Sequence, residues 1–559
     1  MSERLTETEA VRGGSRPGPA GRMPYGRAAH GTPGTPGATG TLVRLDQLLG
    51  RGAPDRPALT FKERTLTYRE LAEQVAAAAY GLYRLGVRRG DRVAVYAEKR
   101  VETVVAVLAV AAAGGVFVPV NPLFKARYLA RLTDDCTPVA LITTAERMET
   151  VRGALTPNTS VRHLVVIGET AAVPPVDDRW KITSWPRLGE PGARPVPGAD
   201  AVIDADVAAV FYTSGSTGGP KGVVLSHRNL LAGAESVATY LAHTEDDVLL
   251  GLLPLSFDAG FSQLTTALAR GAHLVLTNYL VPREVMRLCA RHGVTGLTCV
   301  PPLWMQLAAL EWPREATRRL RYFANTGGRM PAVTLTRLRG HFPQARPYLM
   351  YGLTEAFRST YLDPDEVDRR PDSIGKAIPN AEVLVVRPDG TPCMPGEPGE
   401  LVHRGALVAL GYWNNPETTA LRFRALPGGV PGVRQELAVW SGDTVQRDEE
   451  GFLYFVARAD EMIKSSGYRI SPTEIEEAAY ATGLVTEAVA FGAADEQLGQ
   501  HVVLVVCGPC GTGGLRQAMA RELPAYMLPR RIMELDVLPR SANGKFDRVE
   551  LRRLAEAGS

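Results

Sequence analysis

From about residue 41 onward, short apolar runs alternate with stretches whose apolar residues recur at helical spacing. Val, Leu, Ile and Ala dominate the runs, which lie at 92–97, 116–120, 140–144, 163–167, 273–277 and 296–300. Strands that alternate with helices are typical of parallel sheets covered by helices. We therefore predict an α/β fold whose large N-terminal domain consists of stacked, mostly parallel sheets with covering helices.

The pattern changes near residues 456–461, and a second block follows. This block predicts a helix at 472–480, strands at 488–491 and 502–506, and another helix near 514–522. Such an order indicates a smaller C-terminal α/β domain. The first forty residues are rich in Gly and Pro and hold too little apolar surface to offset the entropy of ordering. The predicted parts are a disordered tail at 1–40, an N-terminal domain at 41–457, a hinge at 458–461 and a mobile C-terminal domain at 462–559.

Composition disfavours several classes of function. The 63 Lys and Arg against 60 Asp and Glu give a net charge of +3, without the basic excess that dominates nucleic-acid binding. The longest apolar stretch, 104–120, is short for a membrane span and is interrupted by paired glycines, so we predict a buried helix followed by a buried strand. Six cysteines do not form a disulfide scaffold, and we expect a reducing, cytoplasmic location.

Residues 212–227, YTSGSTGGPKGVVLSH, carry the strongest local signal. A β-rich run leads into a stretch of Thr, Ser and Gly at 213–219, and Lys221 follows. Small residues let backbone N–H groups approach a polyanion, hydroxyl groups add donors, and the lysine adds positive charge. The segment is therefore predicted to cradle phosphates. It is not the G-x-x-x-x-G-K-[ST] loop, because Gly222 follows the lysine and offers no hydroxyl to Mg²⁺.

This segment resembles the phosphate loop of the adenylate-forming superfamily, which includes acyl-CoA synthetases, adenylation domains of non-ribosomal peptide synthetases and firefly-type luciferases. Other segments resemble that family's further motifs in the same order, so that the resemblance covers roughly residues 41–553. They are YGLTE at 351–355, SGD at 441–443, VARADEMIKSSGYRISPTEIE at 456–476, LPAYMLP at 523–529 and PRSANGKFDR at 539–548. Among family members, the chain is similar to AMP-forming acyl-CoA ligases and to stand-alone adenylating enzymes of natural-product pathways.

The resemblance implies a small β-barrel portion in the N-terminal domain and a C-terminal domain that rotates on a hinge. It also implies a reaction in two steps. A carboxylic or amino acid reacts with ATP in the presence of Mg²⁺, which gives an acyl- or aminoacyl-adenylate and pyrophosphate. A thiol, either CoA or the phosphopantetheine of a carrier protein acting in trans, then displaces AMP.

The resemblance further implies roles for individual residues. It assigns the phosphates of ATP to Thr213, Ser214, Gly215, Thr217, Lys221 and Thr354, and the Mg²⁺ ion to Glu355. It assigns adenine to Gly327, Gly328 and Tyr351, and the ribose region to Asp443 and Arg458. It assigns the bridge between acid and ATP to Lys545, the hinge to Asp460, and the thiol tunnel to Lys464 and Gly467. One departure is Ala457, where most members have Gly.

The acid substrate is the least determined part of the interpretation. The resemblance implies an acyl pocket formed by Phe257, Asp258, Ser262, Cys299, Thr326, Met350 and Arg358. Two interpretations of Asp258 stay open: it pairs with an amino group of the substrate, or it caps a helix that begins near Phe261. Arg358 pairs with a second carboxylate of the substrate or points to solvent.

The leading hypothesis is therefore an ATP-dependent acid–thiol ligase. An amide synthetase, which passes the acyl group to an amine, is the alternative. An oxidative luciferase-like enzyme is a further alternative, which oxygen dependence of AMP release would reveal. A non-catalytic nucleotide binder is disfavoured, because it would not need to keep Lys221, Thr354, Glu355, Asp443, Arg458 and Lys545.

Overall fold

The computed structural model describes residues 42–156, 159–168, 180–214, 220–278, 281–328, 330, 332–427, 432–433, 435–458, 463–470, 472–485, 487–508, 512–539, 546 and 548–557. Residues 41–559 form one compact unit by their internal contacts. The predicted tail at 1–40 and hinge residue Asp460 lie outside the described residues.

The larger of the two N-terminal sheets has 14 strands. Its path is β17 (Ala381–Val386), β18 (Gly399–Gly405), β21 (Leu437–Arg447), β22 (Leu453–Arg458), β16 (Ser373–Ala377), β15 (Thr360–Leu362), β14 (Arg346–Tyr351), β13 (Tyr322–Asn325), β12 (Gly296–Cys299), β10 (Val248–Gly251), β11 (His273–Leu276), β1 (Pro57–Phe61) and β2 (Arg64–Thr67), with β20 (Phe423–Ala425) beside β21. Strands β14, β13, β12, β10, β11 and β1 are parallel, whereas β2 and the strands from β15 onward pair antiparallel.

The second sheet has eight strands and is parallel in its centre. Its order is β19 (Gly411–Tyr412), β9 (Pro220–Ser226), β8 (Val207–Ser214), β4 (Val116–Pro119), β3 (Arg92–Tyr96), β5 (Ala140–Thr144), β6 (His163–Ile167) and β7 (Lys181–Ser184). The predicted phosphate segment begins on β8 and returns on β9, which pair antiparallel. The sequence-predicted strands at 92–97, 116–120, 140–144 and 163–167 are thus confirmed to within a residue.

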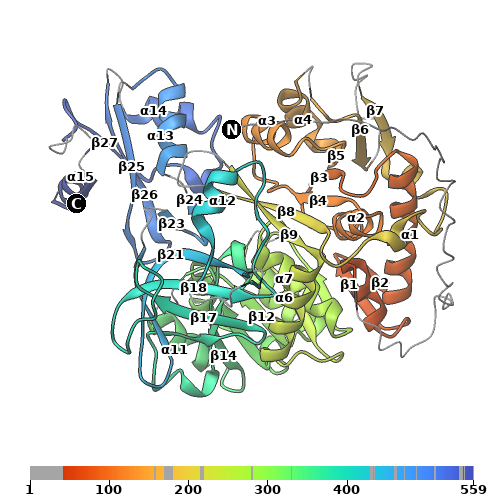
Figure 1. Cartoon of the computed structure of the whole chain (residues 1–559), viewed down its shortest axis with the longest axis horizontal. Helices are drawn as coiled ribbons and strands as arrows, with labels where there is room; N and C mark the ends of the chain where they lie inside the picture. The colour runs from red at the N-terminus through yellow and green to blue at the C-terminus, as the bar shows by residue number, and fades with distance from the viewer. Residues whose placement is uncertain are drawn as a thin grey trace, which may run out of the picture. The chain divides into compact units, whose positions relative to one another are not determined.

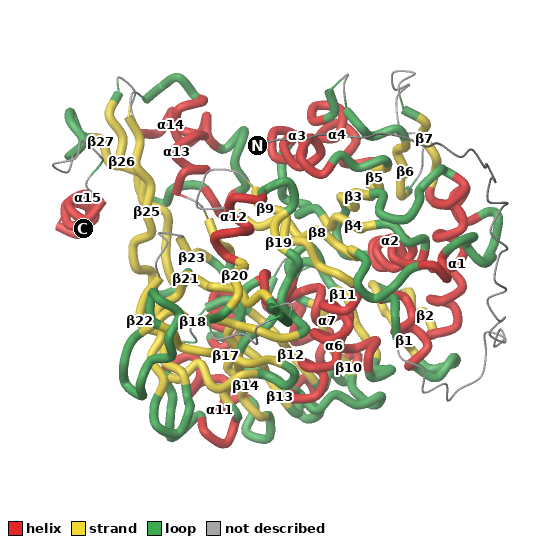
Figure 2. The backbone as a smooth tube through the Cα atoms, viewed as in Figure 1, coloured by secondary structure: helices red, strands yellow, loops and turns green. Residues whose placement is uncertain are grey.

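A layer of helices lies between the two sheets (Figures 1 and 2). It consists of η1 (Leu45–Arg51), α1 (Tyr68–Arg84), α2 (Val101–Ala112), α6 (His227–Tyr240) and α7 (Asp258–Ala269). Helix α2 contacts β4, α6 contacts β9, and α7 contacts β10 and β11, so the layer touches both sheets. The stretch at 104–120 is therefore a buried helix followed by a buried strand, as predicted.

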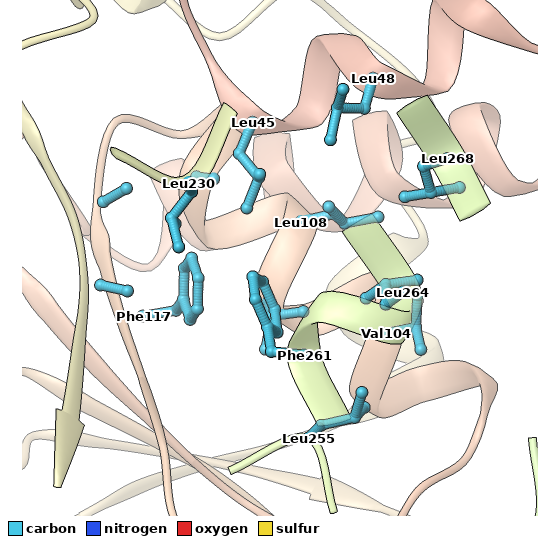
Figure 3. Packing of buried hydrophobic residues seen from close by; sticks show 14 of the residues in the cluster. Leu45, Leu48, Val104, Leu108, Phe117, Leu230, Leu255, Phe261, Leu264 and Leu268 are labelled. Carbon is cyan, nitrogen blue, oxygen red and sulfur yellow. The ribbon is translucent and has the colours of Figure 1, made fainter. Parts of the chain in front are cut away.

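Helix α7 is anchored in the main hydrophobic core (Figure 3). Phe261, Leu264 and Leu268 recur at helical spacing and are buried against Val104 and Leu108 of α2. Each fully buried side chain of this kind contributes about 1.5–3 kcal/mol. This apolar packing holds α7 in place, and with it the first turn of the helix, which begins at Asp258.

Further helices cover the outer faces and connections. They are α3 (Ala126–Cys136), α4 (Met148–Ala154), α5 (Trp185–Gly189), α8 (Pro282–His292), α9 (Pro301–Ala308), α10 (Arg314–Thr317), α11 (Ala332–His341) and α12 (Pro416–Arg422). Within the described ranges, none of the helices combines the length and hydropathy that crossing a bilayer requires.

A third, five-stranded sheet belongs to the C-terminal part of the chain (blue in Figure 1). It consists of β24 (Tyr468–Ile470), β23 (Ile463–Ser465), β26 (Gly499–Cys507) and β25 (Glu487–Asp495) in order, with β27 (Arg531–Glu534) beside β26. Its helices are α13 (Pro472–Ala481), α14 (Thr512–Met519) and α15 (Arg548–Ala557).

Two expectations about the sheets need correction. The described strands form no closed barrel: β16–β18 and β20–β22 extend the end of the 14-stranded sheet, because β16 pairs with β15. The sheets are also less parallel than predicted, because hairpins such as β17–β18 and β8–β9 return the chain directly.

Candidate active site

A cavity of about 970 Å³ lies where several strands end. Thr213 is the last residue but one of β8, Gly327 comes shortly after β13, and Tyr351 is the last residue of β14. Ligands of open α/β sheets bind outside the carboxyl ends of parallel strands. The cavity therefore has the position that this architecture provides for a ligand.

Thr213 and Thr354 line the cavity, and the predicted phosphate and Mg²⁺ residues Lys221 and Glu355 lie beside them, Lys221 paired with Thr213 and Glu355 next after Thr354. The Nζ of Lys221 on β9 lies 5.7 Å from the ring centre of Tyr412 on β19. The Tyr412 hydroxyl donates a hydrogen bond of 2.7 Å to Oε1 of Glu355. Tyr412 thus joins the lysine to the carboxylate, although no motif in the sequence singled it out. We call Thr213, Lys221, Tyr351, Glu355, Tyr412 and Asp443 the nucleotide side.

Glu355 has the donor chemistry that Mg²⁺ requires. Its Oε2 atom is buried and has no hydrogen-bond partner in the described residues, whereas Oε1 is held by Tyr412. An unpartnered buried carboxylate oxygen is costly unless a cation or a donor reaches it. Mg²⁺ is often bound through one or two carboxylates together with substrate phosphates. Among the described residues, no cluster of three or more His, Cys, Asp or Glu side chains is suited to hold a metal.

The predicted adenine and ribose residues meet across two strands. The Tyr351 hydroxyl donates a hydrogen bond to the carboxylate of Asp443, whose backbone N–H donates to Ser441 Oγ at 3.0 Å. Asp443 is almost fully buried and lies opposite Arg458 in the β21–β22 register. Gly327 has φ +77°, a conformation that glycine adopts readily, and it lines the cavity with Gly328. Tyr351 lines the same cavity as the two glycines.

The lining of the cavity also carries an ion pair between Asp258 and Arg358. Arg358 Nη1 donates a hydrogen bond of 2.8 Å to Asp258 Oδ2, and Thr354 Oγ1 donates one of 3.3 Å to Asp258 Oδ1. Arg358 is only 3% exposed, so it does not point to solvent. Helix α7 begins at Asp258 itself, with Phe257 at the N-cap and no side-chain cap. The expected helix start near Phe261 is therefore wrong by three residues, and the Asp258 carboxylate is engaged by Arg358 and Thr354. We call Asp258, Met350 and Arg358 the acid side.

The remaining acyl-pocket predictions divide between the cavity and the core. Thr326 and Met350 line the cavity, and the Tyr240 hydroxyl donates to Met350 Sδ at 2.9 Å. Ser262 lines a small adjoining cavity of about 20 Å³ that Arg358 and Met350 also border. Cys299 borders neither cavity, because its thiol packs into the hydrophobic cluster around Trp304 and Phe323. Burial raises the pKa of that thiol well above its usual range.

The C-terminal sheet contributes a hairpin to the same cavity. Lys464, Gly467 and Tyr468 line it, and the Tyr468 ring meets Phe257 edge-on at 5.2 Å. A Cβ atom on Gly467 would lie 2.8 Å from Cγ1 of Val300, so the backbone of the hairpin approaches the N-terminal part closely. Lys464 Nζ lies 4.7 Å from the ring centre of Phe455. Residues predicted for the thiol tunnel and the acid pocket therefore share one cavity.

A buried lysine on the cavity wall was missed by the sequence reasoning. Lys99 is 6% exposed, and its Nζ donates to the carbonyl oxygens of Gly251 at 2.9 Å and Leu252 at 2.5 Å. Burial lowers its pKa to about 7. The two carbonyls end β10 and lead into the segment that carries Asp258, so Lys99 braces the acid side. Lys99 comes shortly before α2, which begins at Val101, and no sequence motif marks it as a functional residue.

Several predicted residues cannot be placed in the site. Gly215, Thr217, Asp460 and Lys545 lie outside the described residues, and only the backbones of Ser214 and Arg458 are described.

The chain thus has an architecture in two parts, and residues of both parts line one cavity. The chain matches the family model of the AMP-binding enzyme over residues 49–413 and that of the AMP-binding enzyme C-terminal domain over residues 474–545. The chain therefore belongs to the AMP-binding enzyme family, whose members form adenylates.

Three relatives illustrate the range of this family. The chain is 32% identical to an L-proline–[L-prolyl-carrier protein] ligase of Streptomyces coelicolor, with 91% of this chain and 96% of that protein covered. It is 30% identical to tyrocidine synthase 2 of Brevibacillus parabrevis, with 92% of this chain covered, but it spans only 14% of that protein's length. A solved malonyl-CoA ligase ternary product complex, with methylmalonyl-CoA and AMP bound, is 29% identical, with 89% and 100% of the chains covered and a TM-score of 0.72.

Proposed function

We propose that the chain activates a carboxylic or amino acid with ATP and transfers the acyl group to a thiol. One observation carries this proposal: the nucleotide-side residues Thr213 and Tyr351, the acid-side pair and the C-terminal hairpin all line one cavity. Such a reaction joins an acid first to a nucleotide and then to a thiol. The nucleotide and the thiol must therefore both reach the carboxyl group of the acid.

In the first step, the acid's carboxylate oxygen attacks the α-phosphorus of ATP and pyrophosphate leaves. Lys221 and the Thr213 hydroxyl would hold phosphate oxygens, and Mg²⁺ on Glu355 would neutralise charge on the leaving group. Lys545 is proposed to bridge the acid and ATP. Asp443 would accept hydrogen bonds from ribose hydroxyls once Tyr351 releases it.

In the second step, a thiolate attacks the carbonyl carbon of the adenylate and AMP leaves. The hairpin with Lys464 and Gly467 supplies the wall along which a pantetheine arm would enter. The edge-on contact of Phe257 with Tyr468 closes the boundary between that path and the acid side. CoA and the phosphopantetheine of a carrier protein present the same thiol arm, and the carrier-protein ligase relative favours testing a carrier protein as well as CoA.

Acid-dependent exchange of pyrophosphate into ATP tests the first step. Full-length protein is assayed across a panel of amino, fatty, aryl and dicarboxylic acids with ATP and Mg²⁺. We expect exchange that requires both an acid and Mg²⁺. AMP release that needs CoA or a phosphopantetheinylated carrier then tests the second step. Absence of exchange with every acid would contradict the proposed function, and AMP release only with an amine would favour an amide synthetase.

A further inference from the structure

Arg358 holds unused hydrogen-bonding capacity inside the protein. The guanidinium has five N–H donors, and the described contacts use only Nη1, which donates to Asp258 and to the Phe357 carbonyl oxygen at 2.9 Å. Its Nε is buried and has no hydrogen-bond partner among the residues that the structure describes. No described residue accepts from its Nη2. Asp258 pairs with the charge of Arg358, but the N–H groups at Nε and Nη2 have no acceptor among the described residues. Because an N–H group without an acceptor is costly inside a protein, this side chain calls for a further ligand.

The backbone is strained where it turns Arg358 inward. Phe357, the preceding residue, has φ +59° and ψ −53°, a region that costs about 1–3 kcal/mol for a residue other than glycine. Its ring is fully buried and lies against Gly233 of α6, where a Cβ atom would come within 2.5 Å of the ring. The core therefore maintains the strain, and the consequence is a guanidinium on the cavity wall.

The guanidinium group of Arg358 determines which kind of ligand fits this site. Nε is enclosed, so Nη2, which no described residue engages, is the donor that an acidic group in the cavity would meet, and a guanidinium N–H pairs favourably with a carboxylate oxygen. Arg358 borders both the main cavity and the small cavity beside it. Thr354, which starts the predicted phosphate-contacting turn, touches the same Asp258. An acid whose reacting carboxylate lies near Thr354 could thus place a second acidic group on Arg358.

We propose that Arg358 binds a second carboxylate of the acid substrate, so that the enzyme's substrates are dicarboxylic acids. This inference deepens the proposed function and depends on it for the reaction, but not for binding. Charge balance adds a further expectation. When a second carboxylate binds Arg358, the guanidinium balances the negative charge of Asp258 less fully. An ammonium group of the same substrate next to Asp258 would restore neutrality. Acidic amino acids therefore suit the pair better than plain diacids.

The experiment compares matched acids with matched variants of the full-length chain. Aspartate and glutamate are compared with asparagine and glutamine, and succinate with succinamic acid, in acid-dependent ATP–pyrophosphate exchange. The variants are Arg358→Met, the double variant Asp258→Asn/Arg358→Met, and Arg346→Met as control. Arg346 is half exposed and pairs with Asp363 and Asp365 on the surface, so its loss removes an arginine without touching the cavity.

We expect the wild type to use each dicarboxylic acid about 10- to 100-fold better in kcat/KM than its monoamide, because the amide loses a charge-assisted hydrogen bond with the guanidinium. Arg358→Met is expected to reduce that preference to a few-fold, and Arg346→Met to keep it. The double variant removes both charges, so it separates loss of recognition from misfolding, which the melting temperature also reports. Preference for monocarboxylic acids in the wild type, or an unchanged preference in folded Arg358 variants, would overturn the proposal.

Two further readouts complete the design. Asp258→Asn should lower kcat/KM for aspartate but not for succinate; an equal loss for both would remove the ammonium from the proposal. If no acid supports exchange, the proposed function fails, and titration calorimetry then tests Arg358 independently. Binding of aspartate or succinate that Arg358→Met abolishes would support the carboxylate site, and absence of binding would overturn it.

Discussion

The nucleotide side and the acid side of the cavity are assembled in different ways. On the nucleotide side, Thr213 and Lys221 come from one hairpin, and Tyr351 and Glu355 from one short turn. On the acid side, Asp258 and Arg358 are 100 residues apart and meet only in the folded protein. Four of the six nucleotide-side residues thus come from two local segments, and Tyr412 and Asp443 join them through tertiary contacts, whereas the acid-side pair is made by the tertiary structure alone.

The largest effect should come from a residue that serves both sides. Lys545→Ala is expected to lower acid-dependent ATP–pyrophosphate exchange by about 10²–10³-fold for every acid, since it removes a positive charge from the transition state. Thioester formation from a chemically prepared adenylate should persist. Both rates are measured on the same preparation, and equal loss of the two would contradict a role confined to adenylation.

The hairpin of the C-terminal sheet offers a test in which no nucleotide-side or acid-side residue is substituted. Gly467→Ala should slow thioester formation about tenfold or more while exchange stays unchanged, because its added Cβ would lie 2.8 Å from Val300 and φ is +81°. Gly483→Ala is the matched control, with φ +69° but no described atom within 4 Å. If the two variants behave alike, backbone strain rather than the close approach explains the effect.

Tyr412 should have a smaller effect that does not depend on the acid. Tyr412→Phe removes the 2.7 Å hydrogen bond to Glu355 but keeps the ring beneath Lys221. A lost hydrogen bond to a charged group is worth about 1.5–3 kcal/mol, which corresponds to roughly a tenfold to hundredfold loss of exchange. The kcat/KM for several acids should fall by one common factor, and a change in their order would place Tyr412 on the acid side instead.

The smallest effect concerns stability near the acid side. His403 is buried, its Nδ1 lies 3.0 Å from Ser359 Oγ, and burial lowers its pKa to about 4. The unfolded chain therefore binds a proton that the folded chain does not between pH 6.5 and 4, and stability falls by about 3 kcal/mol as the pH drops through this window. His403→Gln should flatten the dependence of melting temperature on pH between 7 and 4.5. An unchanged dependence would assign acid sensitivity to other groups.

Much of the fold and of the nucleotide side could be predicted from the sequence. The strand runs are β-rich and buried on both faces, and the strand at 207–212 before the glycine-rich segment is β8. The barrel and the helix start near Phe261 were wrong, because strand pairing and the dry packing of α7 are tertiary effects. For the same reason, the Asp258–Arg358 pair, Tyr412 and Lys99 could not be derived, because each contacts partners that lie far away in the chain.

The most direct test of this division compares one variant from each side with two acids that the wild type accepts. Exchange kinetics are measured for Glu355→Gln and Arg358→Met with both acids. We predict that Glu355→Gln lowers kcat/KM for both acids by the same factor, about 10²–10³. Arg358→Met should change the ratio between the two acids at least tenfold. A changed ratio in Glu355→Gln, or an equal loss in Arg358→Met, would contradict the separation of a general nucleotide side from a selective acid side.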